Sequence, residues 1–137
     1  MKYQQSELIK SLIDELTLKL EKLEGVYLFG SRAQKTATKI SDWDFGFLCR
    51  EEHIEEIVWN IRTSLETKYD VSVDLVDLYK SNTILQIQVI KTGELIWEGN
   101  LNKVREFEYL TLSYYQKLND ERADILKDIK LRGNIYG

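Results

Sequence analysis

Residues 26–49 read VYLFGSRAQKTATKISDWDFGFLC, which is two apolar runs joined by a polar connection. The first run, residues 26–29, has the length and composition of a short strand. Gly30 and Ser31 follow it directly. A glycine lets the backbone approach a phosphate closely, and the serine hydroxyl and amide can donate hydrogen bonds to phosphate oxygens. The pattern predicts a phosphate-binding turn that continues into a short helix over residues 31–35.

The second apolar run, Trp43–Cys49, begins between two aspartates. Side chains of a strand alternate between faces, so Asp42, Asp44 and Gly46 share one face. The other face is apolar and consists of Trp43, Phe45, Phe47 and Cys49. Two carboxylates ~6–7 Å apart along one strand repel each other, and a divalent cation such as Mg²⁺ or Mn²⁺ removes that repulsion. We therefore expect one core face and one metal-binding face.

A third strand is predicted over residues 71–78, with Asp74 facing away from its apolar side. That apolar side consists of Val71, Val73 and Leu75. If it packs inward beside the aromatic face of the second strand, Asp74 emerges next to Asp42 and Asp44. Three carboxylates on adjacent strands can hold two metal ions ~3.5–4 Å apart, which suits in-line displacement at phosphorus. Asp77 has the opposite parity and is expected to be a turn or helix-entry residue.

Helical and strand-like segments alternate along the whole chain, which predicts an α/β fold with a small mixed sheet of about four strands flanked by helices. Helices are expected over residues 5–24, 51–68, 82–91 and 100–129, the last with a break near 119–120, and a short edge strand over Glu94–Glu98. Ser6 is the expected N-cap of the first helix, and Gly25 its stop. We expect a single domain over residues 1–137, with a catalytic core at 1–99 and a C-terminal helical extension at 100–137.

The composition indicates a small globular protein. The chain has 137 residues, of which 43% are hydrophobic and 31% charged, and this argues against disorder. Lys and Arg total 19 against 23 Asp and Glu, a formal net charge of −4, whereas direct nucleic-acid binding favours a basic excess. The single Cys, the lack of a long apolar run and the lack of a signal-peptide pattern predict a cytoplasmic protein without membrane contact.

The combined motif resembles that of a known family. Gly30-Ser31, followed after ten residues by Asp42-x-Asp44 and by an acid in a later strand, resembles the signature of the DNA polymerase β-like nucleotidyltransferases. The flanking residues, Arg32-Ala33 among them, make the minimal nucleotidyltransferases (MNT) the most similar branch. The resemblance covers about residues 25–98 and implies a polymerase β-like fold with a C-terminal helical extension. In one departure, Lys35 stands where relatives often carry a glycine.

Chains of this size resemble the antitoxins of MNT–HEPN toxin–antitoxin pairs. The resemblance implies a Mg²⁺-dependent enzyme that transfers AMP from ATP to a tyrosine hydroxyl of a HEPN ribonuclease toxin and thereby neutralises it. Two Mg²⁺ ions are implied, with Mn²⁺ as a possible substitute. The implied catalytic and metal-binding residues are Asp42, Asp44 and Asp74, and the implied nucleotide-binding residues are Gly30, Ser31 and Arg32.

Two other functions stay open. One is an antitoxin that neutralises its toxin by binding alone, and the other is a nucleotidyltransferase for a small-molecule hydroxyl, as in aminoglycoside-modifying relatives. At single sites, Gly30-Ser31 can be an ordinary turn, the aspartate pair a solvated strand edge, and Arg32 a surface residue. Residues 107–115 carry more apolar surface than one helical stripe requires, which suits either internal packing or a partner. The remaining expectations are packing roles for Trp43, Trp59 and Trp97, a buried thiol for Cys49 and a solvated His53.

Overall fold

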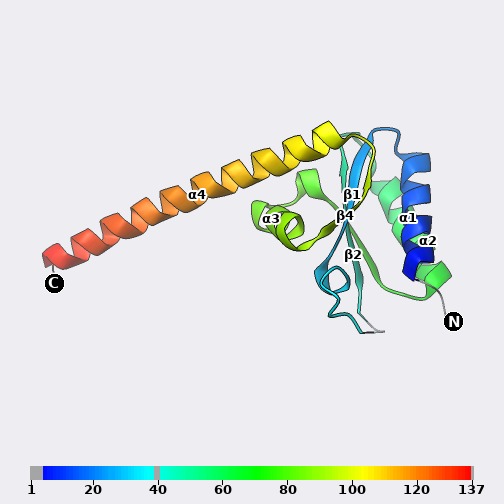
Figure 1. Ribbon diagram of the computed structural model, residues 1–137, viewed down its shortest axis with the longest axis horizontal. Coiled ribbons are helices and arrows are strands. Elements are labelled where there is room, and N and C mark those ends of the chain that lie inside the picture. The colour runs from blue at the N-terminus through cyan, green and yellow to red at the C-terminus, as the bar shows by residue number, and fades with distance from the viewer. Residues whose placement is uncertain (1–4, 39–40, 137) are drawn as a thin grey trace.

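The computed structural model describes residues 5–38 and 41–136 and contains a four-stranded sheet in the order β3-β2-β1-β4 (Figure 1). The strands are β1 (Leu23–Phe29), β2 (Trp43–Cys49), β3 (Val73–Asp77) and β4 (Glu94–Glu98). β1 pairs antiparallel with β2 and β4, and β2 pairs parallel with β3. The predicted small mixed sheet is confirmed.

Helices cover both faces of this sheet. α1 (Gln5–Lys19) and α2 (Glu55–Tyr69) lie on one face, while α3 (Thr83–Thr92) and the first turns of α4 (Leu101–Tyr136) lie on the other (Figure 1). α2 also supplies the crossover that two parallel strands require, because β2 and β3 run in the same direction. The Asn82 side chain accepts a hydrogen bond from the Leu85 amide at 2.8 Å and so caps α3.

The sheet divides the apolar core into two clusters. The cluster under α1 and α2 includes Trp43, Phe45 and Phe47, which are at most 1% exposed. The apolar face predicted for β2 is therefore confirmed. On the opposite face, a Cβ at Gly46 would come within 2.9 Å of the Leu78 side chain. The glycine thus leaves room for a second layer of packing above the strand that carries the aspartates.

The first helix is shorter than predicted, because it ends at Lys19. Ser6 lies inside α1 and is not its N-cap. Gly25 lies within β1 instead of stopping the helix, and a Cβ there would come within 2.8 Å of Val104 in α4. Leu23 keeps the helical spacing of α1, but pairing with β2 holds the chain extended from this residue onward. Tertiary pairing here overrides the local pattern.

The last helix runs without interruption, so the predicted break near residues 119–120 is wrong. Those positions hold Asn and Asp, which are exposed and carry neither the ring of a proline nor the freedom of a glycine. The residues that α4 buries on the sheet side are Val104, Phe107 and Thr111. Residues 112–136, here called the α4 tail, project away from the sheet (Figure 1). Among the described helices, α4 included, none is long and apolar enough to cross a membrane.

The second helix begins at Glu55, later than predicted. The chain turns before it at His53, which has a φ of 59° and a fully solvated side chain, as expected. Trp59 in α2 is 56% exposed, so its predicted packing role is wrong. Cys49 is buried, as predicted, and Trp97 packs partly buried against the core.

Candidate active site

Gly30 forms a tight turn directly after β1, with a φ of 74°. The predicted short helix is reduced to a single 3₁₀ turn, Gly30–Arg32, so its N-terminus offers less positive potential than an α-helix would. The Thr36 amide then donates to the Ser31 carbonyl at 3.0 Å. A side chain at position 30 would collide with the carboxylate of Asp44. The candidate phosphate turn and the acidic strand are therefore in direct contact.

The carboxylates lie on neighbouring strands. Asp44 of β2 and Asp74 of β3 are register partners, and so are Trp43 and Val73. Because Trp43 and Val73 are buried in the core under α1 and α2, the two aspartates project from the opposite face. Asp42 precedes β2 by one residue and is exposed, as is Asp74, while Asp44 is half-buried. The structure thus places Asp74 beside Asp44, as the alternation of the sequence predicts.

The electrostatics of this group centre on Asp44. Burial raises the pKa of its carboxyl group, and the negative charges of Asp74 and Asp42 raise that pKa further. Ionisation of Asp44 therefore carries a free-energy cost, which a positive charge beside the carboxylate would offset. Such repulsion between neighbouring carboxylates is the condition that a hard divalent cation relieves.

The donor set fits a magnesium-like cation in its chemistry. All three side chains offer carboxylate oxygens, and two of them lie in register on adjacent strands. Within residues 5–38 and 41–136, however, no three acidic, His or Cys side chains already converge into a metal-binding cluster. The fit therefore rests on ligand type and strand register, without a preformed cage.

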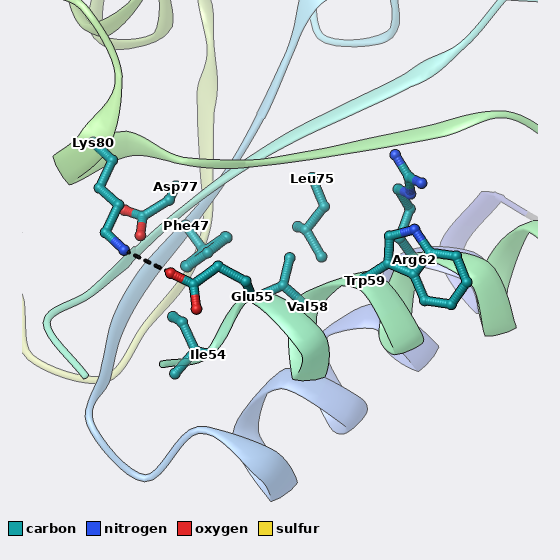
Figure 2. Close-up of a pocket in the computed structure, with 9 residues that line it drawn as sticks. All are labelled: Phe47, Ile54, Glu55, Val58, Trp59, Arg62, Leu75, Asp77 and Lys80. Carbon is teal, nitrogen blue, oxygen red and sulfur yellow. Dashed lines mark hydrogen bonds and ion pairs between the residues drawn. The ribbon is translucent and has the colours of Figure 1, made fainter. Parts of the chain in front are cut away.

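Asp77 serves a separate purpose, as predicted. Its carboxylate accepts a hydrogen bond from the Tyr79 amide at 3.1 Å and starts the 3₁₀ turn that follows β3. A cavity of about 270 Å³ lies between α2 and the edge of the sheet, and Asp77, Phe47 and Lys80 are among the residues that line it. Figure 2 shows these side chains around the cavity. Lys80 Nζ lies 3.1 Å from Glu55 Oε1 at this cavity. Phe47 points to the face opposite Asp44, so this hollow is distinct from the carboxylate site.

Arg32 occupies a position that its sequence context did not indicate. Its guanidinium carbon lies 4.3 Å from the centroid of the Trp43 ring, and its Nη2 donates to the Ser41 carbonyl at 2.8 Å. Trp43 points into the core, away from the carboxylates. The side chain of Arg32 therefore extends toward the opposite face of β2 from Asp44.

Lys35 adopts a left-handed conformation with a φ of 60°. Glycine takes this conformation without the steric penalty that a Cβ introduces. The position at which the family resemblance leads us to expect a glycine is thus one whose backbone favours that residue. The loop retains the turn that glycine would provide and carries local strain instead.

A polar cluster that fastens α4 to the sheet was missed by sequence reasoning. Arg50 Nε lies 3.4 Å from Glu24 of β1, and Arg50 Nη2 lies 3.4 Å from Glu106 of α4. The Tyr79 hydroxyl donates to Glu24, and burial raises the pKa of Tyr79 to about 12, which keeps this donor protonated. The four residues are far apart in the chain, and nothing in their spacing signals that they meet.

A glycine turn set against carboxylates on adjacent strands defines a nucleotidyltransferase type of site. The family model described as "Polymerase beta, Nucleotidyltransferase" matches residues 10–102. The chain belongs to this polymerase beta nucleotidyltransferase family.

One similar protein and two similar solved structures relate this chain to toxin–antitoxin systems. The protein adenylyltransferase MntA of Shewanella oneidensis is 34% identical over 125 residues, which are 91% of this chain and 86% of that protein. A crystal structure of a toxin–antitoxin with AMP-PNP matches with a TM-score of 0.73 and 33% identity, over 88% of this chain and 96% of that one. A structure of tri-AMPylated Shewanella oneidensis HEPN toxin in complex with MNT antitoxin matches with a TM-score of 0.72 and 31% identity, over 92% of this chain and 98% of that one. The likeness therefore includes much of α4.

Proposed function

We propose that this chain is an antitoxin adenylyltransferase that transfers AMP from ATP to a tyrosine hydroxyl of a HEPN-family toxin and so neutralises it. Its similarity to MntA, a protein adenylyltransferase, supports the activity. The observation that carries the proposal is the contact between the Gly30 turn and Asp44, with Asp74 in register beside it. This arrangement sets a phosphate-binding backbone against the acids that nucleotidyl transfer requires.

Separate residues of the site bind the nucleotide and the metal ions. Gly30 and Ser31 bind the triphosphate through the backbone amide and the hydroxyl. Asp42, Asp44 and Asp74 would hold two Mg²⁺ ions, for which Mn²⁺ could substitute. When bound, these ions neutralise phosphate charge and make a phenolic hydroxyl easier to deprotonate.

The transfer itself is an in-line substitution. The tyrosine oxygen forms a bond to the α-phosphorus, and the bond from that phosphorus to the bridging oxygen of the β-phosphate breaks. Pyrophosphate leaves, and Asp74, the exposed member of the pair, accepts the phenolic proton. Burial and the charges of Asp74 and Asp42 raise the pKa of Asp44, and a cation held beside it would favour its ionised form.

The α4 tail is the surface that we assign to the toxin. Phe107 and Thr111 pack against the sheet domain, but the apolar pattern of α4 continues beyond them. Within residues 112–131, the exposed large apolar side chains are Leu112, Tyr114, Leu118, Ile125, Leu126, Ile129 and Leu131. A run of this kind is typical of a protein–protein contact. We place the complex in the cytoplasm, where the buried Cys49 thiol stays reduced.

Co-expression tests the function against simple masking. The HEPN-family toxin is expressed with the wild-type chain, with Asp44→Asn or with no antitoxin, and growth is recorded beside the AMP content of the toxin. We expect wild type to restore growth with AMP attached and Asp44→Asn to fail in both. Rescue by Asp44→Asn without AMP would mean that binding alone neutralises, and AMP found on an aminoglycoside instead would indicate a small-molecule enzyme.

A further inference from the structure

We propose that Arg32 is a positioning residue that fixes the backbone of Asp42 and Asp44, and not a ligand of the leaving phosphates. The inference rests on the proposed function, since it concerns the same site. It starts from the direction of the side chain. The guanidinium lies over the ring of Trp43, the residue between the two aspartates, on the face of β2 that carries the core.

The hydrogen bond from Arg32 closes the loop between the phosphate turn and β2. Its Nη2 donates to the carbonyl of Ser41, nine residues along the chain, at 2.8 Å. That carbonyl belongs to the peptide unit whose nitrogen is the amide of Asp42. Other bonds of the described part of this loop are more local, such as that from the Thr38 amide to Ser41 Oγ at 2.8 Å. Arg32 therefore joins the start of the loop to the residue that precedes the first carboxylate.

The contacts require a guanidinium in particular. Arginine stacks on an aromatic ring and donates within its own plane at the same time, which a lysine ammonium does not reproduce. Arg32 Nε is buried, and within the described residues it has no hydrogen-bond partner. The side chain is thus held by the ring and by the Ser41 carbonyl, on the face of β2 opposite Asp44.

A positioning role and a phosphate contact predict different kinetics. Displacement of catalytic groups by about 1 Å lowers the rate roughly 100-fold while substrate binding persists. Loss of a direct contact with ATP in its ground state instead raises KM. The relative changes in kcat and in the KM for ATP therefore distinguish a positioning role from a phosphate contact.

The test compares Arg32→Gln and Arg32→Lys with wild type. Lys35→Gln is the matched control, because it removes a positive charge from the same loop at an exposed position. The measurements are kcat and the KM for ATP with Mg²⁺ and the HEPN-family toxin as acceptor, the affinity for AMP-PNP, and the ¹⁵N shift of the Asp42 amide. That shift reports the hydrogen bond on the Ser41 carbonyl and needs neither nucleotide nor toxin.

We expect Arg32→Gln to move the Asp42 resonance and to lower kcat roughly 100-fold, with less than about a threefold change in KM or in AMP-PNP affinity. Arg32→Lys should fall between Arg32→Gln and wild type, and the control should match wild type. A tenfold rise in KM with kcat unchanged would overturn the proposal, as would an unchanged Asp42 resonance with unchanged kinetics. Wild type that transfers nothing would overturn the proposed function, while the Asp42 resonance would still report on Arg32.

Discussion

At the scale of single residues, the proposed site depends on Asp44, whose ionised carboxylate destabilises the folded chain. The pKa of Asp44 is raised by burial and then by Asp74 and Asp42. The folded chain therefore binds a proton at this carboxyl more tightly than the unfolded chain does. Above the folded pKa, ionised Asp44 destabilises the fold, and this penalty disappears as the pH falls toward the unfolded value of about 3.9.

Asp44→Asn should consequently stabilise the metal-free protein while removing its activity. We expect the Tm near pH 7 in EDTA to rise by roughly 2–5 °C, and the difference from wild type to shrink as the pH falls. Mg²⁺ should raise the Tm of wild type more than that of the variant, since only wild type keeps all three proposed ligands. Thermal melts across pH with and without Mg²⁺ measure both effects. A variant less stable than wild type at neutral pH would contradict the argument.

Gly30→Ala should disturb both the turn after β1 and the position of the Asp44 carboxylate. The φ of 74° disfavours any Cβ, and this Cβ would collide with the Asp44 carboxylate. We expect AMP transfer to fall roughly 100-fold or more, because the carboxylate must move. Ser31→Ala, which removes only a hydroxyl, is the milder control. Initial rates of both variants test this, and a Gly30→Ala enzyme as active as wild type would show that the contact is dispensable.

Lys35→Gly tests the strain in the loop. A Cβ in the left-handed conformation destabilises the fold by about 1–2 kcal/mol, and Lys35→Gly removes that penalty. Part of the stabilisation is lost, because glycine makes the unfolded chain more flexible. The net effect should be a stabilisation of about 0.5–1 kcal/mol in urea unfolding. Lys35→Ala keeps the Cβ while removing the charge and should show no such gain. Equal stabilisation by both variants would point to charge as the cause.

At the scale of elements, the strand that carries the aspartates follows from local pattern. Trp43–Cys49 has the bounds expected from alternation, and the parity of Asp74 correctly places it beside Asp44. The end of α1 cannot be predicted from the local pattern, because Leu23 fits a helical period and only its pairing with β2 makes it part of a strand. The stacking of Arg32 on Trp43 is equally invisible in the sequence, since it depends on how the loop between them folds back.

The α4 tail should tolerate substitution in the isolated protein and not in the complex. Leu118 and Ile125 are 37% and 59% exposed, so Leu118→Glu and Ile125→Glu should leave the Tm within about 2 °C of wild type. We expect both to weaken binding of the HEPN-family toxin at least tenfold, because they place a charge on the proposed contact surface.

Gln116→Glu is the matched control for these variants. It introduces the same side chain about half a turn away from Leu118 around the helix. Isothermal titration of each variant with the toxin measures the effect. Unchanged affinity of Leu118→Glu and Ile125→Glu would remove the tail from the interface.

At the scale of the whole molecule, the two faces of the sheet divide structure from chemistry. α1 and α2 cover the face of the larger core, while the carboxylates project from the face that also carries α3 and the start of α4 (Figure 1). The formal net charge of −4 argues against generic binding of polyanions, and we propose that cations held by three of the acids would offset that charge locally. The proposed nucleotide site, with an extended helix beside it, suits a reaction whose acceptor is carried by another protein.

The proposed AMP transfer can be read from the intact mass of the toxin. Purified HEPN-family toxin is incubated with ATP, Mg²⁺ and the chain, either wild type or Asp44→Asn, and then weighed by mass spectrometry. We predict that wild type increases the toxin mass by one or more whole AMP units located on tyrosine, and that Asp44→Asn leaves the mass unchanged. An unmodified toxin with the wild-type chain, or equal modification by both chains, would contradict the assignment of Asp44 and its neighbours as a nucleotidyl-transfer site.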